Sequence, residues 1–529
     1  MKLAYNPHRS GRCGQGPFPA ARHLSGGCAM RTTSASWVGA ILYLLALGRA
    51  LAAAEGGHEG VREERLGPLL KPILSPAFSK GGLHFAYVTR KGEKCLVVVD
   101  GKPGPEYDKI AGLAFSPEGG RVAYAARKGD KRLVVVLDGV PGPEYDAIAK
   151  GSPAFSPDGQ RVAYAAKKGE KMLVVLDGQP GPEHDGIGGG SLAFSPDGKR
   201  VAYAARSGGK WFVVLDGQPE PEHDGIGAGT PVFSPDGKRV AYAAKKGEKM
   251  LAVLDGQPGP EYDAILGGSP LFSPDGKRVA YGAKKGDKWF VVLDGQRGPE
   301  HDGITDASLV FSPDGKRVAY VAKKGQKMLV VLDGQPGPEY DGIGGGSPVF
   351  SVDGKRVAQV AKKGDKMLVV LDGQPGPEYD GIVKGTPVFS RDGQRVAYAA
   401  KKGEKMLVVL DGEPGPEYDG TGGGTLVFSP DGKRVAYAAD KGGNWFVVLD
   451  GRPGPECDAM LEGTPVFSAD GQRVAYAAKK GGKWFVVLDG KPGPEYDLII
   501  KGGPTLHPDS AVEYLAARDG VLYRVKHVP

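Results

Sequence analysis

Membrane-spanning helices and disulfide networks are the first features that this 529-residue sequence lacks. Its most apolar stretch, Trp37–Leu47, holds about eleven residues, whereas a membrane-spanning helix needs roughly 20. Only four cysteines are present: Cys13 and Cys28 precede that stretch, and Cys95 and Cys457 fall in widely separated repeats. Residues so placed are not expected to approach to disulfide distance, so we predict neither a membrane span in the mature chain nor a disulfide framework.

Catalytic motifs are also missing. The sequence contains no nucleophile elbow, phosphate-binding loop or metal-binding helix motif. Glycine-rich stretches such as Gly188–Gly190 lack a following helix pattern and are interpreted as turns. His184, His223 and His301 stand in separate copies of a repeat, too far apart to share a metal ion. The sequence therefore predicts no catalytic residue, no metal site and no cofactor.

A strong excess of charge is lacking as well. The formal net charge is +7, but six of the basic residues and no acidic residue lie within residues 1–54. Loss of that segment takes six positive charges from +7 and leaves a chain near +1. Nucleic-acid binding needs many unpaired cations, so no nucleic-acid partner is expected.

What the sequence does contain is one unit copied in tandem. The ten residues F-S-P-D-G-K-R-V-A-Y begin identically at Phe194, Phe233, Phe272, Phe311 and Phe428. From Phe155 onward the copies start every 39 residues, and the last, degenerate copy starts at Leu506. Such a constant period indicates a solenoid, a propeller or another repeat array.

Each unit predicts four short strands. The apolar run before Ser-Pro-Asp-Gly is the first, R-V-A-Y-A-A the second, M-L-V-V-L or W-F-V-V-L the third, and E-Y-D-G-I the fourth. The Asp-Gly pair supplies the turn geometry even where its proline is replaced, as at Val352. In the second strand Val162 and Tyr164 face one way and Ala163 and Ala165 the other. Sheets with one bulky and one shallow face favour stacking face to face in an all-β propeller.

At these residues the chain resembles the TolB-type, WD-like β-propeller repeat family, whose hallmark is aromatic-Ser-Pro-Asp-Gly followed by an apolar residue, a small residue and an aromatic one. The resemblance covers roughly residue 67 to the C-terminus and implies the propeller fold. It implies no single function, because related propellers act as binding platforms, protease gates and interaction modules. No segment before Gly67 matches the extra N-terminal domain of TolB, so the partner of TolB is not carried over.

The two ends of the repeat region predict a shared blade. The last unit, Pro504–Pro529, supplies a turn and two strands but no fourth strand. Gly67–Ile73 aligns with Gly104–Ile110 one unit later, as a fourth strand without its first three. Joining them removes a free sheet edge and gives twelve four-stranded blades. Constant spacing slightly favours a single ring; the alternative is two six-bladed rings that exchange at Gln296–Gly298.

The segment ahead of the repeats is interpreted as a leader. Met30 is expected to be the true start, with Arg31 and the apolar run before a cleavage zone at Ala52 or Ala54. We therefore expect residues 1–54 to be leader and signal peptide, 55–66 a polar linker and 67–529 the propeller domain, in a periplasmic or secreted protein. The alternative is an uncleaved signal anchor.

Charge is expected to separate between the two ends of the sheets. The K-K-G-E-K hairpins and the glycine-rich returns are predicted at one end with net +2 per unit, and the acidic residues toward the other end and the outer rim. That basic end is a candidate binding surface for an anionic envelope surface or an acidic partner. Its lysines are Lys167, Lys168, Lys245, Lys246, Lys284, Lys285, Lys323, Lys324, Lys362, Lys363, Lys401 and Lys402. The other interpretation is a set of solvated turns that keep sheet edges apart.

Departures from the repeat are the other candidate positions. Arg297, His301, Thr305 and Asp306 fall in one unit, and Gln359 alone replaces the second-strand tyrosine. Drift among the copies explains them equally well. The sequence favours an exported, non-enzymatic scaffold that binds proteins. The alternatives are an envelope-, carbohydrate- or anionic-surface-binding module, and an enzyme or enzyme subunit with its site at the channel mouth.

Overall fold

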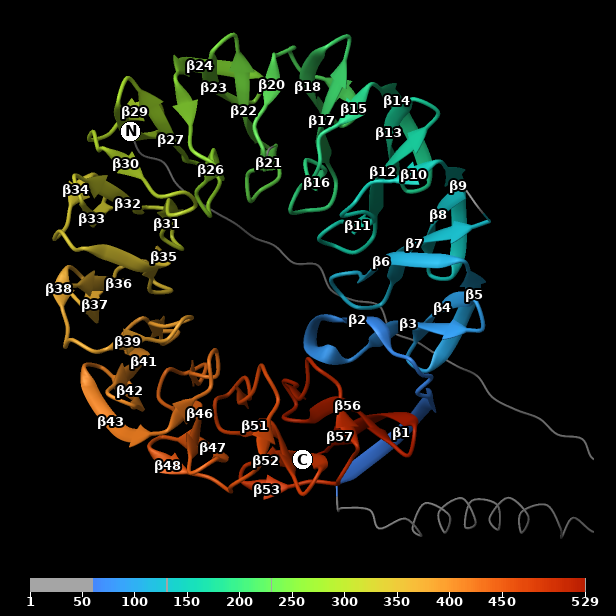
Figure 1. Cartoon of the computed structure of the whole chain (residues 1–529), viewed down its shortest axis with the longest axis vertical. Helices are drawn as coiled ribbons and strands as arrows, with labels where there is room; N and C mark the ends of the chain where they lie inside the picture. The colour runs from blue at the N-terminus through green and yellow to red at the C-terminus, as the bar shows by residue number, and fades with distance from the viewer. Residues whose placement is uncertain (1–59, 130–131, 230, 529) are drawn as a thin grey trace, which may run out of the picture. The chain divides into compact units, whose positions relative to one another are not determined.

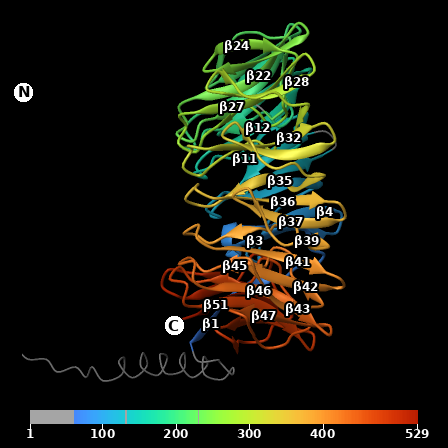
Figure 2. The same ribbon diagram turned by 90° about the vertical axis from the view of Figure 1, so that its left-hand side faces the viewer.

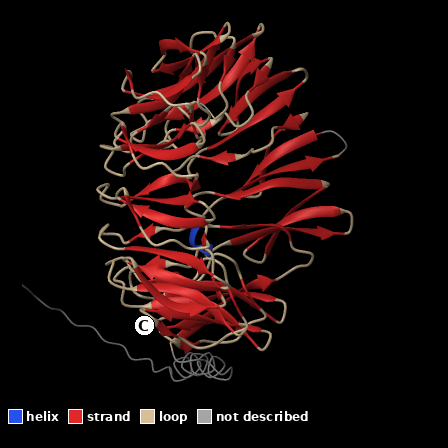
Figure 3. Ribbon diagram, turned by 60° about the vertical axis from the view of Figure 1, so that its left-hand side comes forward, coloured by secondary structure: helices blue, strands red, loops and turns tan. Residues whose placement is uncertain are grey.

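The computed structural model describes residues 60–129, 132–229 and 231–528. The expected leader and the first five residues of the expected linker lie outside these ranges. Within them the chain is almost entirely β-structure, with one short 3-10 helix, η1 (Lys80–Gly82), at the first turn (Figure 3).

Twelve antiparallel sheets stand side by side in a single closed ring (Figure 1). This confirms the predicted twelve-bladed propeller and its single ring, and the two-ring alternative is wrong. We number the sheets as blades in chain order, from blade 1 (β2–β5) to blade 12 (β54–β57 with β1). Seen from the side, the strands of successive blades lie one above another (Figure 2).

The first strand of each blade lies nearest the centre of the ring, and in most blades it is split in two. These inner strands are β2(Leu74–Phe78), β6(Lys109–Phe115), β10(Ala147–Ile148), β11(Ala154–Phe155), β15(Gly186–Ile187), β16(Ala193–Phe194), β20(Gly225–Ile226), β21(Val232–Phe233), β25(Ala264–Ile265), β26(Leu271–Phe272), β30(Gly303–Ile304), β31(Val310–Phe311), β35(Gly342–Phe350), β39(Gly381–Ile382), β40(Val388–Phe389), β44(Gly420–Thr421), β45(Val427–Phe428), β49(Ala459–Met460), β50(Val466–Phe467), β54(Leu498–Ile499) and β55(Thr505–Leu506). The second strands are β3(Phe85–Lys91), β7(Val122–Lys128), β12(Val162–Lys168), β17(Val201–Ser207), β22(Val240–Lys246), β27(Val279–Lys285), β32(Val318–Lys324), β36(Val357–Lys363), β41(Val396–Lys402), β46(Val435–Lys441), β51(Val474–Lys480) and β56(Val512–Arg518).

The third and fourth strands complete each blade toward the rim. The third strands are β4(Lys94–Val99), β8(Arg132–Leu137), β13(Lys171–Leu176), β18(Lys210–Leu215), β23(Lys249–Leu254), β28(Lys288–Leu293), β33(Lys327–Leu332), β37(Lys366–Leu371), β42(Lys405–Leu410), β47(Asn444–Leu449), β52(Lys483–Leu488) and β57(Val521–His527). The outer strands are β5(Lys102–Tyr107), β9(Val140–Tyr145), β14(Gln179–His184), β19(Gln218–Pro219), β24(Gln257–Tyr262), β29(Gln296–Arg297), β34(Gln335–Pro336), β38(Gln374–Pro375), β43(Glu413–Tyr418), β48(Arg452–Pro453), β53(Lys491–Pro492) and β1(Val61–Pro68).

The outer strand differs from the predicted one. Asp177 and Gly178 both have positive φ, 51° and 79°, which makes a two-residue hairpin turn after the third strand. The outer strand therefore starts at Gln179 and runs through Pro-Gly-Pro to His184, instead of beginning at the glutamate. The residues that follow, Gly186–Ile187, already pair with the next blade, so the predicted strand E-Y-D-G-I is split between two blades.

The Ser-Pro-Asp-Gly turn is held by a backbone hydrogen bond and by its serine side chain. The Gly159 amide donates to the Ser156 carbonyl at 2.8 Å, and the Ser156 hydroxyl accepts from the Arg161 amide at 2.9 Å. Where valine replaces the proline, the Gly354 amide still donates to the Ser351 carbonyl at 2.9 Å. The expectation that Asp-Gly preserves this turn is confirmed.

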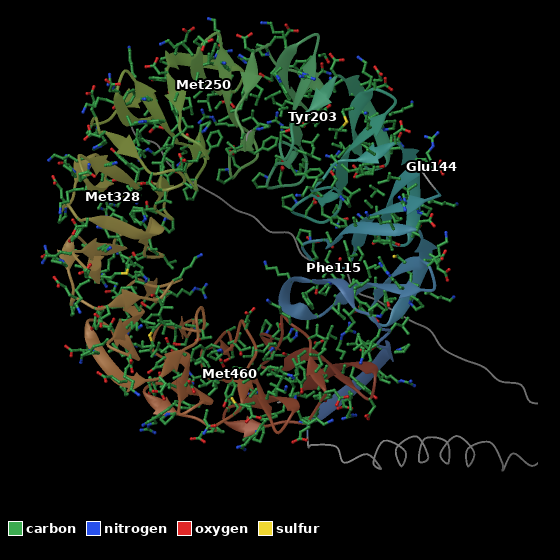
Figure 4. The ribbon with its side chains drawn as sticks, viewed as in Figure 1. Phe115, Glu144, Tyr203, Met250, Met328 and Met460 are labelled. Carbon is green, nitrogen blue, oxygen red and sulfur yellow. The ribbon has the colours of Figure 1, made fainter. Side chains whose placement is uncertain are left out.

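The hydrophobic core lies between blades, bulky face against shallow face. Tyr437 and Val435 of blade 10 pack in one buried cluster with Ala397 and Ala399 of blade 9. In Figure 4, Tyr203 lies inside the wall of the ring, Phe115 toward its centre and Glu144 on its outer rim. Because each sheet buries its apolar residues only against its neighbours, the ring depends on closure.

Closure occurs in blade 12. Strand β1 is the outermost strand of that sheet and pairs with β57 from Val61↔His527 to Pro68↔Val521. The predicted union of the two chain ends is confirmed, but the predicted strand Gly67–Ile73 is wrong in its bounds: the strand starts six residues before the expected domain boundary and ends at Pro68. Residues from Val61 onward, expected to be linker, are strand because the seven-residue β57 offers a partner along its whole length.

Candidate functional site

The twelve predicted lysines lie at one end of their blades, which we name the hairpin end. It comprises the ends of the second and third strands, such as Lys168–Lys171, and the end of the outer strand, such as Glu183–Asp185. All twelve are exposed except Lys284, which is half-buried. The structure therefore places these side chains on one surface of the ring, as expected.

That surface does not carry the expected net charge of +2 per unit. In the copy around Lys245 and Lys246, the ladder brings Glu261 opposite the start of β23, and Lys246 Nζ lies 3.0 Å from its carboxylate. Lys249 Nζ hydrogen-bonds Asp263 at the same end. Glu261 and Asp263, which were expected at the opposite end, are therefore here, whereas Asp255 of the Asp-Gly turn does lie at the opposite end, beside Arg239. With Glu248 included, the hairpin end of this unit holds three lysines and three carboxylates.

The aspartate at the hairpin end also joins neighbouring blades. Asp263 accepts a hydrogen bond from Lys249 of its own blade and another, at 2.6 Å, from the Gly286 amide of the next blade. The bond from Lys249 lowers the pKa of Asp263, and the Gly286 amide lowers it further; the same ion pair raises the pKa of Lys249. These charges act as structural links, and the carboxylates offset the charge of Lys246 and Lys249 at the hairpin end.

The glycine-rich returns were expected at this hairpin end, and that expectation is wrong. Between Ile148 and Ala154, five residues of the inner strand stand opposite only two of β12, so the return bulges from the middle of the innermost strand. The return of blade 7 carries the exposed Asp306, and Glu462 pairs with Lys501 at 2.6 Å between the returns of blades 11 and 12.

The four irregular positions are only partly brought together. Arg297 lies on the outer strand of blade 6, with its guanidinium 3.9 Å from the centre of the Phe290 ring. His301 is buried, and its Nε2 lies 3.2 Å from the Tyr320 hydroxyl of blade 7. Burial lowers the pKa of His301. Gln359 is buried in β36 of blade 8 and Asp306 is exposed on an inner return, so neither shares a site with Arg297.

A site that the sequence did not predict recurs at the opposite end, between neighbouring blades near the rim. At the junction of blades 10 and 11 it is an open pocket of about 550 Å³, lined by Arg434, Pro453 and Pro455 on one side and by Tyr476 and the Asp489–Gly490 turn on the other. We name such spaces junction pockets. Homologous residues line pockets of about 410 Å³ between blades 6 and 7 and about 390 Å³ between blades 3 and 4.

Each junction pocket has polar groups among apolar walls. The guanidinium of Arg434 donates to Asp450 through Nε at 2.9 Å and, through Nη1, to the Gln472 carbonyl of the next blade at 2.7 Å. The Tyr476 hydroxyl is buried and has no hydrogen-bond partner among the residues that the structure describes. Burial raises its pKa to about 12, so it is a neutral donor near pH 7. The pocket can therefore offer hydrogen-bond donors to a small polar group.

Two further findings concern the described part of the chain. No helix in it has the length and apolar character required to cross a bilayer. Within the same ranges, no three histidine, cysteine, aspartate or glutamate side chains are grouped so that they could hold a metal ion.

Comparisons with known proteins give no family assignment. No protein-family model and no curated relative match the chain. Among solved structures, the chain is similar to a eukaryotic initiation factor at 16% identity and TM-score 0.36, covering 64% of this chain and 96% of that one. It is also similar to TolB from Acinetobacter baumannii at 19% identity and TM-score 0.22, covering 50% of this chain and 84% of that one. The propeller fold of this chain rests on its own strand pairing.

Proposed function

We propose that this protein is an exported, non-enzymatic scaffold that binds protein partners through its ring. The observation that carries the proposal is the uniformity of the ring: the same lysines, aspartates, arginines and tyrosines recur in nearly every blade. Catalysis requires different groups that converge on one substrate, whereas identical groups at regular intervals suit extended or multivalent binding.

The described irregular residues support the same conclusion. Arg297 contacts Phe290 and Glu300 of its own blade, and His301 contacts the tyrosine of the next blade, so both have structural partners. At the hairpin end, several lysines form ion pairs with carboxylates of their own blade, such as Lys246 with Glu261, Lys327 with Asp341 and Lys366 with Asp380. For this reason we do not propose that end as a lipid- or polysaccharide-binding surface.

Binding is tested with the purified mature chain immobilised on beads and exposed to envelope and secreted proteins of the source organism. We expect the beads to retain a defined protein. We also expect the same chain, added in soluble form, to release that protein from the beads. The matched control is a chain that lacks residues 58–68, which cannot complete blade 12. Turnover of a substrate in a broad hydrolase screen, or no retention beyond the control, would contradict the scaffold.

Export is tested separately, because it depends on residues outside the described ranges. Residues 1–54 and residues 30–54 are each fused to an enzyme that is active only after export. Equal activity from both fusions is expected if Met30 is the true start, and no activity from either would refute export.

A further inference from the structure

One junction pocket is filled by the protein itself. In blade 4 the outer strand reads Gln-Pro-Glu-Pro, so Glu220 stands where blades 3, 6 and 10 have Gly181, Gly298 and Gly454. The Glu220 side chain is half-buried and reaches across the junction to blade 5. A Cβ atom built on Gly256 would lie 2.6 Å from Glu220 Oε2, which places the carboxylate directly over the Asp255–Gly256 turn.

The position of that carboxylate shows which residues surround a group in a junction pocket, although the Tyr242 hydroxyl of this junction has no hydrogen-bond partner in the described part of the chain. Gly256 corresponds to Gly217, Gly334 and Gly490, each of which lines an open pocket. Tyr242 corresponds to Tyr476; burial raises the pKa of Tyr242, and the nearby Glu220 charge raises it further. Where glycine replaces Glu220, the same walls enclose a space that the chain leaves open.

Two of the open pockets also carry an additional arginine at the mouth. Arg452 occupies the position of Gln179 between blades 10 and 11, and Arg297 occupies the position of Pro180 between blades 6 and 7. Arg452 is exposed, and Lys316 also lines the second of these pockets. An arginine beside a neutral tyrosine hydroxyl is a suitable pair of donors for a carboxylate.

We propose that the junction pockets of blades 6/7 and 10/11 bind glutamate side chains of an acidic segment in a partner protein. The proposal rests on the scaffold function and names the chemistry of the partner. An acidic peptide is favoured as the occupant because Arg297 and Arg452 make these two pocket mouths positively charged, and a glutamate side chain carries the same carboxylate that Glu220 places in blade 4. Between blades 10 and 11 the bound carboxylate lies over Gly490, beside the unpartnered Tyr476 hydroxyl and with Arg452 at the entrance. Between blades 6 and 7 it lies over Gly334, where it competes with Glu300 for Arg297 and with His301 for the Tyr320 hydroxyl.

The test uses the mature chain and a fluorescent peptide with glutamate at alternate positions, followed by anisotropy at low salt. The variant G298E/G454E fills both pockets from within, as Glu220 does in blade 4. We expect it to weaken binding by about tenfold or more, because each lost charge-assisted contact costs about a factor of ten. The matched control E220G changes the same position in a different junction, so it should bind the peptide at least as well as the parent chain.

A second variant, R297Q/R452Q, removes the additional charge without adding volume. We again expect binding about tenfold weaker, together with a smaller dependence of affinity on salt. Melting temperatures of all variants are compared with that of the parent chain, and R297Q/R452Q remains informative if G298E/G454E does not fold.

The outcomes separate the two proposals. Unchanged peptide binding by both double variants, no binding by the parent chain, or binding of polygalacturonate in place of the peptide would overturn the pocket assignment. If an envelope protein is still retained in those cases, the scaffold function stands. If that retention is also lost in G298E/G454E and kept in E220G, the natural partner uses these pockets.

Discussion

The carboxylate of Asp185 accepts a hydrogen bond from the Gly208 amide at 2.8 Å, across the junction between blades 3 and 4. Its other oxygen accepts from Lys171 of its own blade at 2.6 Å. Equivalent bonds join Asp302 to Gly325 and Asp419 to Gly442. At the opposite end of the blades, Arg161 donates to the Lys199 carbonyl of the next blade at 2.7 Å. From blades 2/3 to blades 11/12, each junction is therefore held at both ends by a charged side chain, with apolar packing between them.

Acid is expected to weaken the ring through these aspartates. The lysine bond first, and the glycine amide second, lower the pKa of Asp185, Asp224 and Asp263 in the folded chain. The ordinary pKa of an aspartate in the unfolded chain is near 4. Because the folded chain has a lower pKa, these aspartates stabilise the fold at pH values above about 4, and the stabilisation is lost as the pH falls through the lowered pKa. The melting temperature should thus change little from pH 7 to pH 5 through these groups and fall below about pH 4. The variant D185N/D224N/D263N should melt at a lower temperature at pH 7, and its melting temperature should fall less in acid than that of the parent chain. An equal fall in acid would refute this role.

Replacing Gln359 with tyrosine should stabilise the ring. Tyr379 and Tyr398 form an edge-to-face pair at 6.2 Å across the junction of blades 8 and 9. Tyr340 meets Gln359 at the corresponding place, where no second ring is present. Because Gln359 is only 7% exposed, Q359Y should raise the free energy of unfolding by about 1 kcal/mol through a new aromatic pair and added apolar burial. The urea midpoint measures the change. The reverse change Y398Q should lower it, and a destabilised Q359Y would show that the site cannot admit a ring.

Glu63 should be essential to the seam that closes the ring. Its carboxylate accepts from Arg518 Nη2 at 2.7 Å and from the Tyr496 hydroxyl, which ties β1 to blades 11 and 12. E63A leaves a half-buried guanidinium without this partner and should lower the free energy of unfolding by about 1–3 kcal/mol. Exposed Arg62 on the same strand provides the control, R62A, for which little change is expected. Equal urea midpoints for the two variants would contradict the closure account.

The two cysteines of the repeat region should differ in reactivity. Burial raises the pKa of the Cys457 thiol to about 11, and this side chain is only 3% exposed. Cys95 is half-buried in the third strand of blade 1. Because the thiolate is the reactive form, a thiol reagent at pH 8 should modify Cys95 in the folded protein and Cys457 only after unfolding. Mass spectrometry of the labelled peptides identifies the modified residue, and early labelling of Cys457 would show that its blade opens.

Some of the site could be read from the sequence and some could not. The second-strand lysines were correctly placed on one surface, because a hairpin turn fixes the end of its own two strands. The net charge of that surface was not predicted correctly, because Glu261 and Asp263 reach Lys246 and Lys249 only through the register of the outer strand. The junction pockets are formed by residues of two blades, so no single repeat predicts them. The replacement of Gly by Glu220 was the one signal available in the sequence.

By itself, the sequence determined the unit, its turns and the number of blades. A period of 39 residues and Asp-Gly pairs are local properties, and they specify strands and turns wherever the chain goes. The alternation of tyrosine and alanine in the second strand likewise determined which faces meet, as the packing of Tyr437 on Ala397 shows. Tertiary structure alone decided that twelve blades form one ring, that the acidic residues join the lysines, and that Val61 begins the closing strand. Those outcomes depend on the angle and register between neighbouring sheets, which arise from contacts between residues of different blades.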